Sequence, residues 1–172
     1  MHSENRSGQG GQGEFEAIQG DADMPSALAA VEQASDQDWI LVQPGLFNYP
    51  LAEGETPALI ANRCRHCGAK YFPKRTMCPR CVSRDVEDCF LSRRGIIYAS
   101  TVVYIDSPVG IKAPYACGYV DLTEDKIRIF SLFSGADHAS FLPGNEVELV
   151  LGPVRKNDTG QDVIGYMFKQ VL

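Results

Sequence analysis

The chain has 172 residues, of which 44% are apolar, and a net charge of −6 at pH 7. This length allows one ordinary domain, or one small domain with an appendage, and the composition is typical of a globular protein with a core. No stretch approaches the roughly 18 uninterrupted apolar residues of a spanning helix, so we expect no membrane association. The N-terminus lacks a basic start followed by an apolar run, so we expect no secretory signal and a cytoplasmic location.

Charge is distributed unevenly along the chain. Residues 1–55 carry ten acidic side chains and one basic one, residues 56–84 carry seven basic side chains and no acid, and residues 85–172 carry twelve acids and eight bases. An acidic chain with one basic segment favours a local anionic ligand or a partner surface over a coat for nucleic acid.

The N-terminal third is expected to contain little regular structure. Residues 1–23 are rich in Gly, Gln, Ser and acids, which predicts a disordered tail. Residues 24–56 are expected to hold a short helix, with Pro25 at its first position, and then an irregular docking linker with two prolines and two glycines. The linker carries a dense apolar cluster, which either packs on this protein's own core or docks on another subunit. Its members are Leu46, Phe47, Tyr49 and Leu51.

Residues 57–91 carry the strongest motif, a C-x2-C-x10-C-x2-C pattern. Six cysteines in a chain without an export signal argue against a disulfide framework, and two C-x-x-C pairs at this spacing predict a rubredoxin-like zinc ribbon with one zinc ion per chain. An iron centre is the alternative. Four thiolates leave no open coordination position, so the metal is expected to be structural. The expected ligands are Cys64, Cys67, Cys78 and Cys81.

The remaining nucleophiles and acids give no convincing catalytic group. Cys117 needs a base, and His138 in an exposed turn is the only candidate, so a buried thiol is the better interpretation. The acids Asp121, Glu124 and Asp125 cluster at a predicted hairpin, where solvated charges are ordinary. We therefore expect no enzymatic activity from this chain alone.

Residues 92–172 show an all-β pattern of β-branched and aromatic runs separated by Gly, Pro, Asn and Asp. Five short strands with a longer break between the third and fourth predict a barrel of the OB type, whose usual helix is reduced to a turn. The fold class is therefore mainly β: a short N-terminal helix, a zinc ribbon and a five-stranded OB-fold barrel. The expected strands are 95–105, 115–122, 126–133, 146–151 and 163–171.

Five basic residues near the second and third barrel strands are candidates for contacts with phosphates, because OB barrels bind ligands across these strands and the flanking loops. A solvated charge is the alternative for each of them. The candidates are Lys112, Lys126, Arg128, Arg93 and Arg94.

A zinc ribbon followed directly by an OB barrel resembles a known family. The FP-x-R-x-x-CP-x-C knuckle and the APY…GYVDL strand are similar to the zinc-ribbon/OB family of acyl-CoA-associated proteins, formerly a domain of unknown function, over about residues 25–170. The resemblance implies a non-catalytic accessory subunit that docks on a thiolase-fold catalytic subunit and helps to form its acyl-CoA site. One member group serves benzoylsuccinyl-CoA thiolase in anaerobic toluene degradation. The five basic residues would then meet coenzyme A phosphates.

Two other functions remain open from the sequence. The first is a nucleic-acid-binding module, with bases stacked on barrel aromatics, although the acidic chain makes nucleic acid an unfavoured partner. The aromatics available for stacking are Tyr115, Tyr119, Phe130 and Phe133. The second is an independent acyl-CoA hydrolase or transferase that depends on Cys117 or His138.

Overall fold

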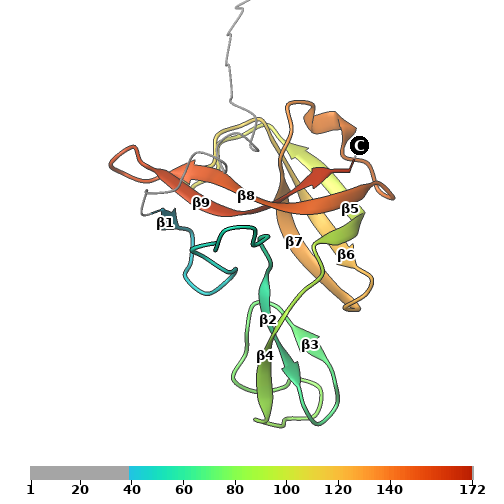
Figure 1. Cartoon of the computed structure of the whole chain (residues 1–172). Coiled ribbons are helices and arrows are strands. Elements are labelled where there is room, and N and C mark those ends of the chain that lie inside the picture. The colour runs from blue at the N-terminus through green and yellow to red at the C-terminus, as the bar shows by residue number, and fades with distance from the viewer. Residues whose placement is uncertain (1–38, 172) are drawn as a thin grey trace, which may run out of the picture.

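Residues 39–171 form a small ribbon module and a closed β-barrel (Figure 1). The computed structural model describes residues 39–171, so the predicted tail and N-terminal helix lie outside the described residues. No helix in this part of the chain is long and apolar enough to cross a membrane. The elements are β1 (Ile40–Leu41), β2 (Ile60–Cys64), β3 (Lys70–Tyr71), β4 (Val86–Phe90), β5 (Arg94–Val103), β6 (Tyr115–Leu122), β7 (Ile127–Phe133), η1 (His138–Ser140), β8 (Glu146–Lys156) and β9 (Asp162–Gln170).

Strands β5 to β9 close into the predicted five-stranded barrel. Antiparallel pairs link β5 to β6, β6 to β7, β8 to β9 and β8 back to β5, and β7 closes the ring by pairing in parallel with β9. This strand order is that of an OB barrel. The helix that usually joins the third and fourth strands is a single 3-10 turn, η1, as predicted.

The two tight turns expected in the barrel are both present. The Asp125 N–H donates to the Leu122 carbonyl over 3.1 Å in the β6–β7 hairpin. The Asn145 N–H donates to the Leu142 carbonyl over 3.1 Å ahead of β8, and Gly144 supplies the positive φ of 93° that this turn requires.

The fourth barrel strand is longer than predicted. Gly152 and Pro153 end the apolar run, and the prediction stopped at residue 151, but β8 continues to Lys156. The pairing with β9 shifts between Pro153 and Arg155, and a proline can be accommodated at such an irregularity in a ladder. The sequence pattern therefore located the strand but not its end.

The linker before the ribbon packs on the chain's own core. Leu46 and Phe47 are buried, and Tyr49 and Leu51 are half-buried against the same cluster. The short strand β1, which was not predicted, pairs in parallel with β9 at one end of this linker. The apolar side chains of the linker thus find their partners within this molecule.

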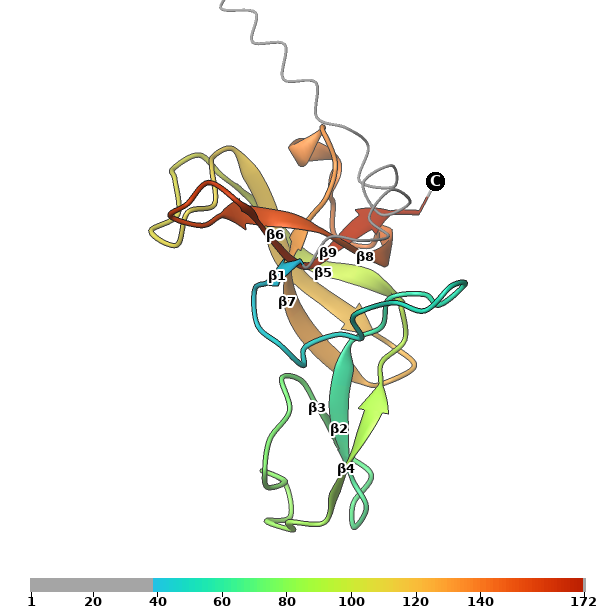
Figure 2. The same cartoon turned by 60° about the vertical axis from the view of Figure 1, so that its left-hand side comes forward.

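The ribbon is a three-stranded sheet in the order β3-β2-β4, and it projects from one end of the barrel in both views (Figures 1 and 2). Its interior is small: Ala61, Cys64 and Cys78 are fully buried there. The barrel core is larger and includes Val120, Leu149 and Phe168, all with 0% exposure.

Candidate metal centre and the surfaces around it

The four cysteines of the motif converge at the ribbon tip. All four sulfur atoms lie within 4.8 Å of one another. Cys64 Sγ is 3.5 Å from Cys81 Sγ, and Cys67 Sγ is 3.6 Å from Cys78 Sγ. A tetrahedral ion with Zn–S bonds of about 2.3 Å places its sulfur ligands about 3.8 Å apart, so these residues fit one metal ion.

Each C-x-x-C pair forms a tight backbone turn, called a knuckle, and the two knuckles have the same hydrogen-bond pattern. In the first, the Gly68 N–H donates to the Cys64 carbonyl over 2.8 Å, and in the second the Val82 N–H donates to the Cys78 carbonyl over 2.9 Å. The residue after each second cysteine has a positive φ, 72° at Gly68 and 60° at Val82. The sequence predicts a positive φ at Gly68 but not at Val82, because β-branched residues rarely adopt this conformation.

Neighbouring groups favour the thiolate form of the buried cysteines. The Tyr71 hydroxyl lies 3.5 Å from Cys78 Sγ, and its hydrogen bond is the main cause that lowers the pKa of Cys78 to about 6. The pKa of Cys64 is lowered mainly by the backbone N–H of Cys67. Thiolates are the form that binds metal, so the surroundings of Cys64 and Cys78 suit a cation, whereas burial and the neighbouring thiols raise the pKa of Cys81. Tyr71 was not identified from the sequence, and His66 is exposed, as expected.

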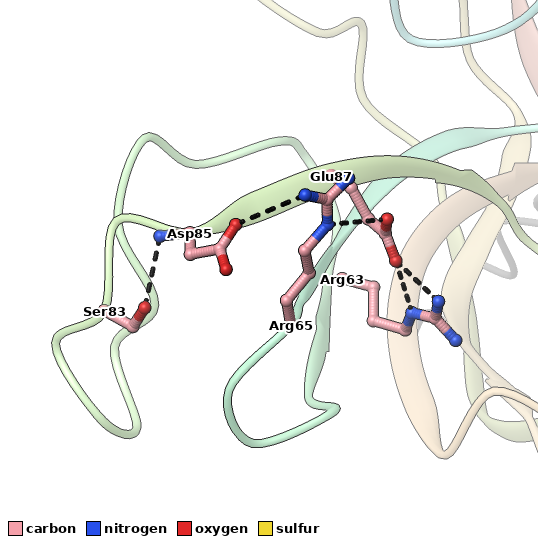
Figure 3. Close-up of polar contacts among 5 residues, drawn as sticks. All are labelled: Arg63, Arg65, Ser83, Asp85 and Glu87. Atoms are coloured by element: carbon pink, nitrogen blue, oxygen red, sulfur yellow. Dashed lines mark hydrogen bonds and ion pairs between the residues drawn. The ribbon is translucent and has the colours of Figure 1, made fainter.

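The basic segment 56–84 is largely neutralised by the strand that follows it. Arg63 and Arg65 both form ion pairs with Glu87 on β4 (Figure 3). The N···O distances are 2.5 and 2.9 Å. Lys74 Nζ lies 2.8 Å from Asp88 Oδ2. The hydrogen bond from Arg63 is the main cause of the lowered pKa of Glu87. The basic segment is therefore far less positive in space than in sequence.

Three arginines keep the charge of this segment free. Within residues 39–171, none of the three makes an ion pair with an acidic side chain. They are Arg75, Arg80 and Arg84.

An ion pair at the β6–β7 hairpin joins the ribbon to the barrel. Lys70 of β3 pairs with Asp125, whose side chain is only 5% exposed. Asp125 also accepts hydrogen bonds from the N–H and hydroxyl of Ser92, over 2.7 and 2.8 Å. Burial alone would raise the pKa of Asp125, but the bonds from Lys70 and Ser92 outweigh it and hold the pKa below its ordinary value. The expectation of a solvated Asp125 is therefore wrong.

The five candidate phosphate ligands are not brought together as one site. Lys112 lies just before the start of β6, and the other four candidates lie near the end of that strand. An eight-residue strand is roughly 25 Å long, so Lys112 is far from the others. Three of the five are held in ion pairs with acids of this chain. These pairs are Lys112–Asp106 at 2.6 Å, Arg128–Asp121 at 2.6 Å and Arg93–Glu148 at 3.0 Å. Among the described residues, Lys126 and Arg94 are the two candidates without such a pair.

Within residues 39–171, neither Cys89 nor Cys117 is hydrogen-bonded to a base. Cys117 is 7% exposed on β6, and burial raises its pKa. His138 Nδ1 is buried and has no hydrogen-bond partner in the described structure, and no hydrogen bond joins His138 to Cys117 there. Cys89 is half-buried on β4, and burial is the main cause of its raised pKa.

The fold and the site place this chain in the class of proteins that carry a four-cysteine ribbon directly before an OB barrel. Residues 52–87 match the ChsH2 rubredoxin-like zinc ribbon domain, and residues 90–152 match the ChsH2 C-terminal OB-fold domain. The chain therefore belongs to the ChsH2 zinc-ribbon/OB-fold family, also called DUF35.

Relatives within this family include thiolase subunits. The chain is 40% identical over 134 residues to the benzoylsuccinyl-CoA thiolase subunit BbsA of Thauera aromatica, covering 78% of this chain and 90% of that protein. It is 36% identical over 136 residues to BbsA of Geobacter metallireducens, covering 79% and 90%. A DUF35 domain-containing scaffold protein of Methanocaldococcus jannaschii is 32% identical over 121 residues, covering 68% and 84%.

The solved Ltp2-ChsH2(DUF35) aldolase contains a chain of the same fold. It superposes with a TM-score of 0.55 at 22% identity, over 67% of this chain and 86% of that one. At this identity the likeness concerns the fold alone.

Proposed function

We propose that this chain is a non-catalytic accessory subunit of a thiolase-type enzyme that acts on an acyl-CoA. The observation that carries the proposal is its 40% identity to a benzoylsuccinyl-CoA thiolase subunit over 90% of that protein's length. Within residues 39–171 no hydrogen bond joins Cys117 to a base, which agrees with it. The chain docks on the catalytic subunit in the cytoplasm, and the catalytic subunit supplies the reacting groups. Benzoylsuccinyl-CoA thiolase of anaerobic toluene degradation is the particular enzyme that these relatives favour.

The metal in this proposal is one structural zinc ion, held by the four clustered cysteines. Four thiolates fill a tetrahedral shell and leave no position for substrate. Bound zinc would fix the two knuckles, whose module has too small an interior to fold on apolar burial alone. Its contribution is to hold the ribbon in shape.

The acyl-CoA is expected near the interface with the catalytic subunit. Lys126 and Arg94 are the two candidates that keep a free positive charge, and they lie at the same end of the barrel strands. They could meet a coenzyme A phosphate there. Lys112, Arg93 and Arg128 are bound to acids of this chain and would have to exchange that partner for a phosphate.

Co-expression with the thiolase encoded beside this chain tests the proposal. We expect a stable hetero-oligomer whose thiolase activity is lost when this chain is omitted and restored when it is added back. A thiolase that is soluble and fully active without this chain would contradict the proposal. Turnover of acyl-CoA by this chain alone would contradict its non-catalytic role.

Nucleic-acid binding is the second candidate, because Tyr119 and Phe130 are exposed on the second and third barrel strands, where OB folds stack bases. Of the other two aromatics considered for stacking, Phe133 is buried against Phe141 and Tyr115 is half-buried. Oligonucleotide binding that weakens steeply with salt would favour this function over the thiolase subunit.

A further inference from the structure

The outer surface of β5, β6 and β7 carries an unusual set of apolar side chains, which we call the aromatic face. It comprises Ile96 and Tyr98 of β5, Tyr119 of β6 and Phe130 of β7, with exposed fractions of 38%, 54%, 48% and 52%.

Side-chain contacts together with the strand register place the aromatic face on one continuous surface. Tyr119 and Phe130 are paired across the strands, and their rings meet edge to face with centroids 5.5 Å apart. The guanidinium carbon of Arg128 lies 3.1 Å from the ring centroid of Tyr98. Arg128 in turn pairs across the strands with Asp121, which is itself opposite Ile96. The residues therefore form a single patch over three strands.

The barrel does not need these residues for its own core. Side chains alternate along each strand, and the inward-facing neighbours Ile97, Val120 and Ile129 are at most 3% exposed. Outward-facing positions of a solvated antiparallel sheet are normally polar. Three half-exposed rings leave about 300 Å² open if an aromatic side chain offers about 200 Å², which is within the range of the largest apolar patch on a typical monomer, and such a patch is often functional.

The charges at this surface identify the kind of partner. Asp121 binds Arg128 through two hydrogen bonds of 2.6 and 2.9 Å, and this pair lies among the apolar side chains. The cation within the aromatic face is thus already neutralised by the chain itself, and the free cations Arg94 and Lys126 lie only at its edge, whereas a nucleic-acid site requires free cations along the path of the backbone. An uncharged apolar protein surface complements a neutral aromatic one.

We propose that the aromatic face is the surface on which the thiolase-type catalytic subunit docks, through an apolar and uncharged patch of that subunit. The inference rests on the proposed function and adds the location of the interface. A standard interface buries about 800 Å² on each partner, so the aromatic face supplies its centre and the surrounding polar residues supply the rim. Lys126, which follows Asp125 in the adjacent hairpin, would belong to that rim. Buried aromatic side chains at an interface centre dominate affinity.

Tyr119→Ser, Phe130→Ser and the double variant test the inference in the full chain. The partner is the thiolase encoded beside this chain, and the dissociation constant is measured by calorimetry. We expect each single variant to bind at least tenfold more weakly. Tyr104→Ser is the matched control, because Tyr104 is 78% exposed in the loop after β5 and lies outside the aromatic face. It should bind within twofold of the wild type. Unchanged zinc content and circular dichroism establish that each variant is folded.

The outcomes separate the inference from the function on which it rests. If the wild type forms the complex and the double variant binds equally well, the docking surface is elsewhere and the proposed function stands. If the wild type forms no complex, both the docking surface and the proposed function are wrong. A single-stranded oligonucleotide and light scattering of the chain alone complete the test. Oligonucleotide binding, or self-association, that the double variant abolishes would assign the aromatic face to another occupant and overturn the inference.

Discussion

At the scale of single residues, the four clustered cysteines differ from the other two in what surrounds them. Cys78 is buried at the tip of the ribbon among three other sulfurs, whereas Cys89 lies alone on β4 of the same ribbon. We predict that Cys78→Ser reduces the bound zinc from one ion per chain to a small fraction, because a serine hydroxyl is a far poorer ligand than a thiolate. Elemental analysis of the purified protein measures this and also reports iron.

The matched control is Cys89→Ser, which makes the same chemical change within the same module. It should keep a full complement of metal. A Cys78→Ser variant that retains its zinc, or a Cys89→Ser variant that loses it, would show that the cluster is not the site.

The two knuckles allow a reciprocal test of backbone strain. Val82 has a φ of 60° and is 66% exposed. The left-handed backbone conformation is therefore unfavourable for this residue, and little burial of its side chain offsets the strain. We predict that Val82→Gly does not destabilise the ribbon, because the relief of about 1–2 kcal/mol offsets the entropy that glycine loses. Gly68→Val introduces the same strain into the first knuckle and should destabilise it. Thermal unfolding of the metal-bound protein compares the two variants, and equal effects would contradict the argument.

At the scale of elements, Asp125 fixes the ribbon to the barrel. Its carboxylate accepts from Lys70 of β3 and from Ser92 between the two modules. Asp125→Asn removes the charge and leaves the amine of Lys70 without its counter-ion, which should lower the unfolding free energy by roughly 1–3 kcal/mol. Chemical denaturation measures the loss. Glu124→Gln alters the adjacent exposed acid and should change stability little.

The same carboxylate makes stability depend on pH in acid. Its folded pKa is lowered, so the stabilisation is fully present above the unfolded value of about 3.9 and is lost as pH falls through the folded pKa. We predict that the difference in stability between the wild type and Asp125→Asn shrinks below about pH 4. Protonation of the cysteines also weakens metal binding in acid, so the difference between the two proteins is the informative quantity. A constant difference from pH 3 to pH 7 would contradict the role of Asp125.

The sequence predicted the elements better than the contacts between them. Alternation and turn residues located all five barrel strands, and cysteine spacing located the metal site, because both are local patterns. The end of β8 was missed because Pro153 falls at an irregularity in the ladder. The neutralisation of Arg63 and Arg65 by Glu87 follows from the register between β2 and β4, which no local pattern contains. Tyr98 was missed because an unbroken apolar run does not reveal which of its side chains face outward.

At the scale of the whole molecule, the two modules derive their stability from different sources. Apart from its cysteines, the ribbon has little buried apolar surface. The barrel has a large buried core, which contains side chains such as Ile97, Val120 and Phe168 and extends to Leu59 and Leu91 at either end of the ribbon. We predict that removal of zinc with a chelator unfolds residues 60–90 and leaves the barrel folded. Hydrogen exchange should show loss of protection in β2 and β4 while the amides of β6 and β9 stay protected.

Contacts between the ribbon and the barrel limit how independently the two modules can unfold. Phe72 of the ribbon packs edge to face on Tyr166 of β9 with ring centroids 5.5 Å apart, and Lys70 pairs with Asp125. If these contacts coupled the modules strongly, the chelator would remove protection from β6 and β9 as well, and the protein would unfold as one unit. The core of the barrel is closed by its own five strands, so loss of the ribbon should cost it these edge contacts and the packing of Ala61 and Cys89 against the core. Because the aromatic face lies on β5 to β7, the metal-free chain should then retain its central docking surface.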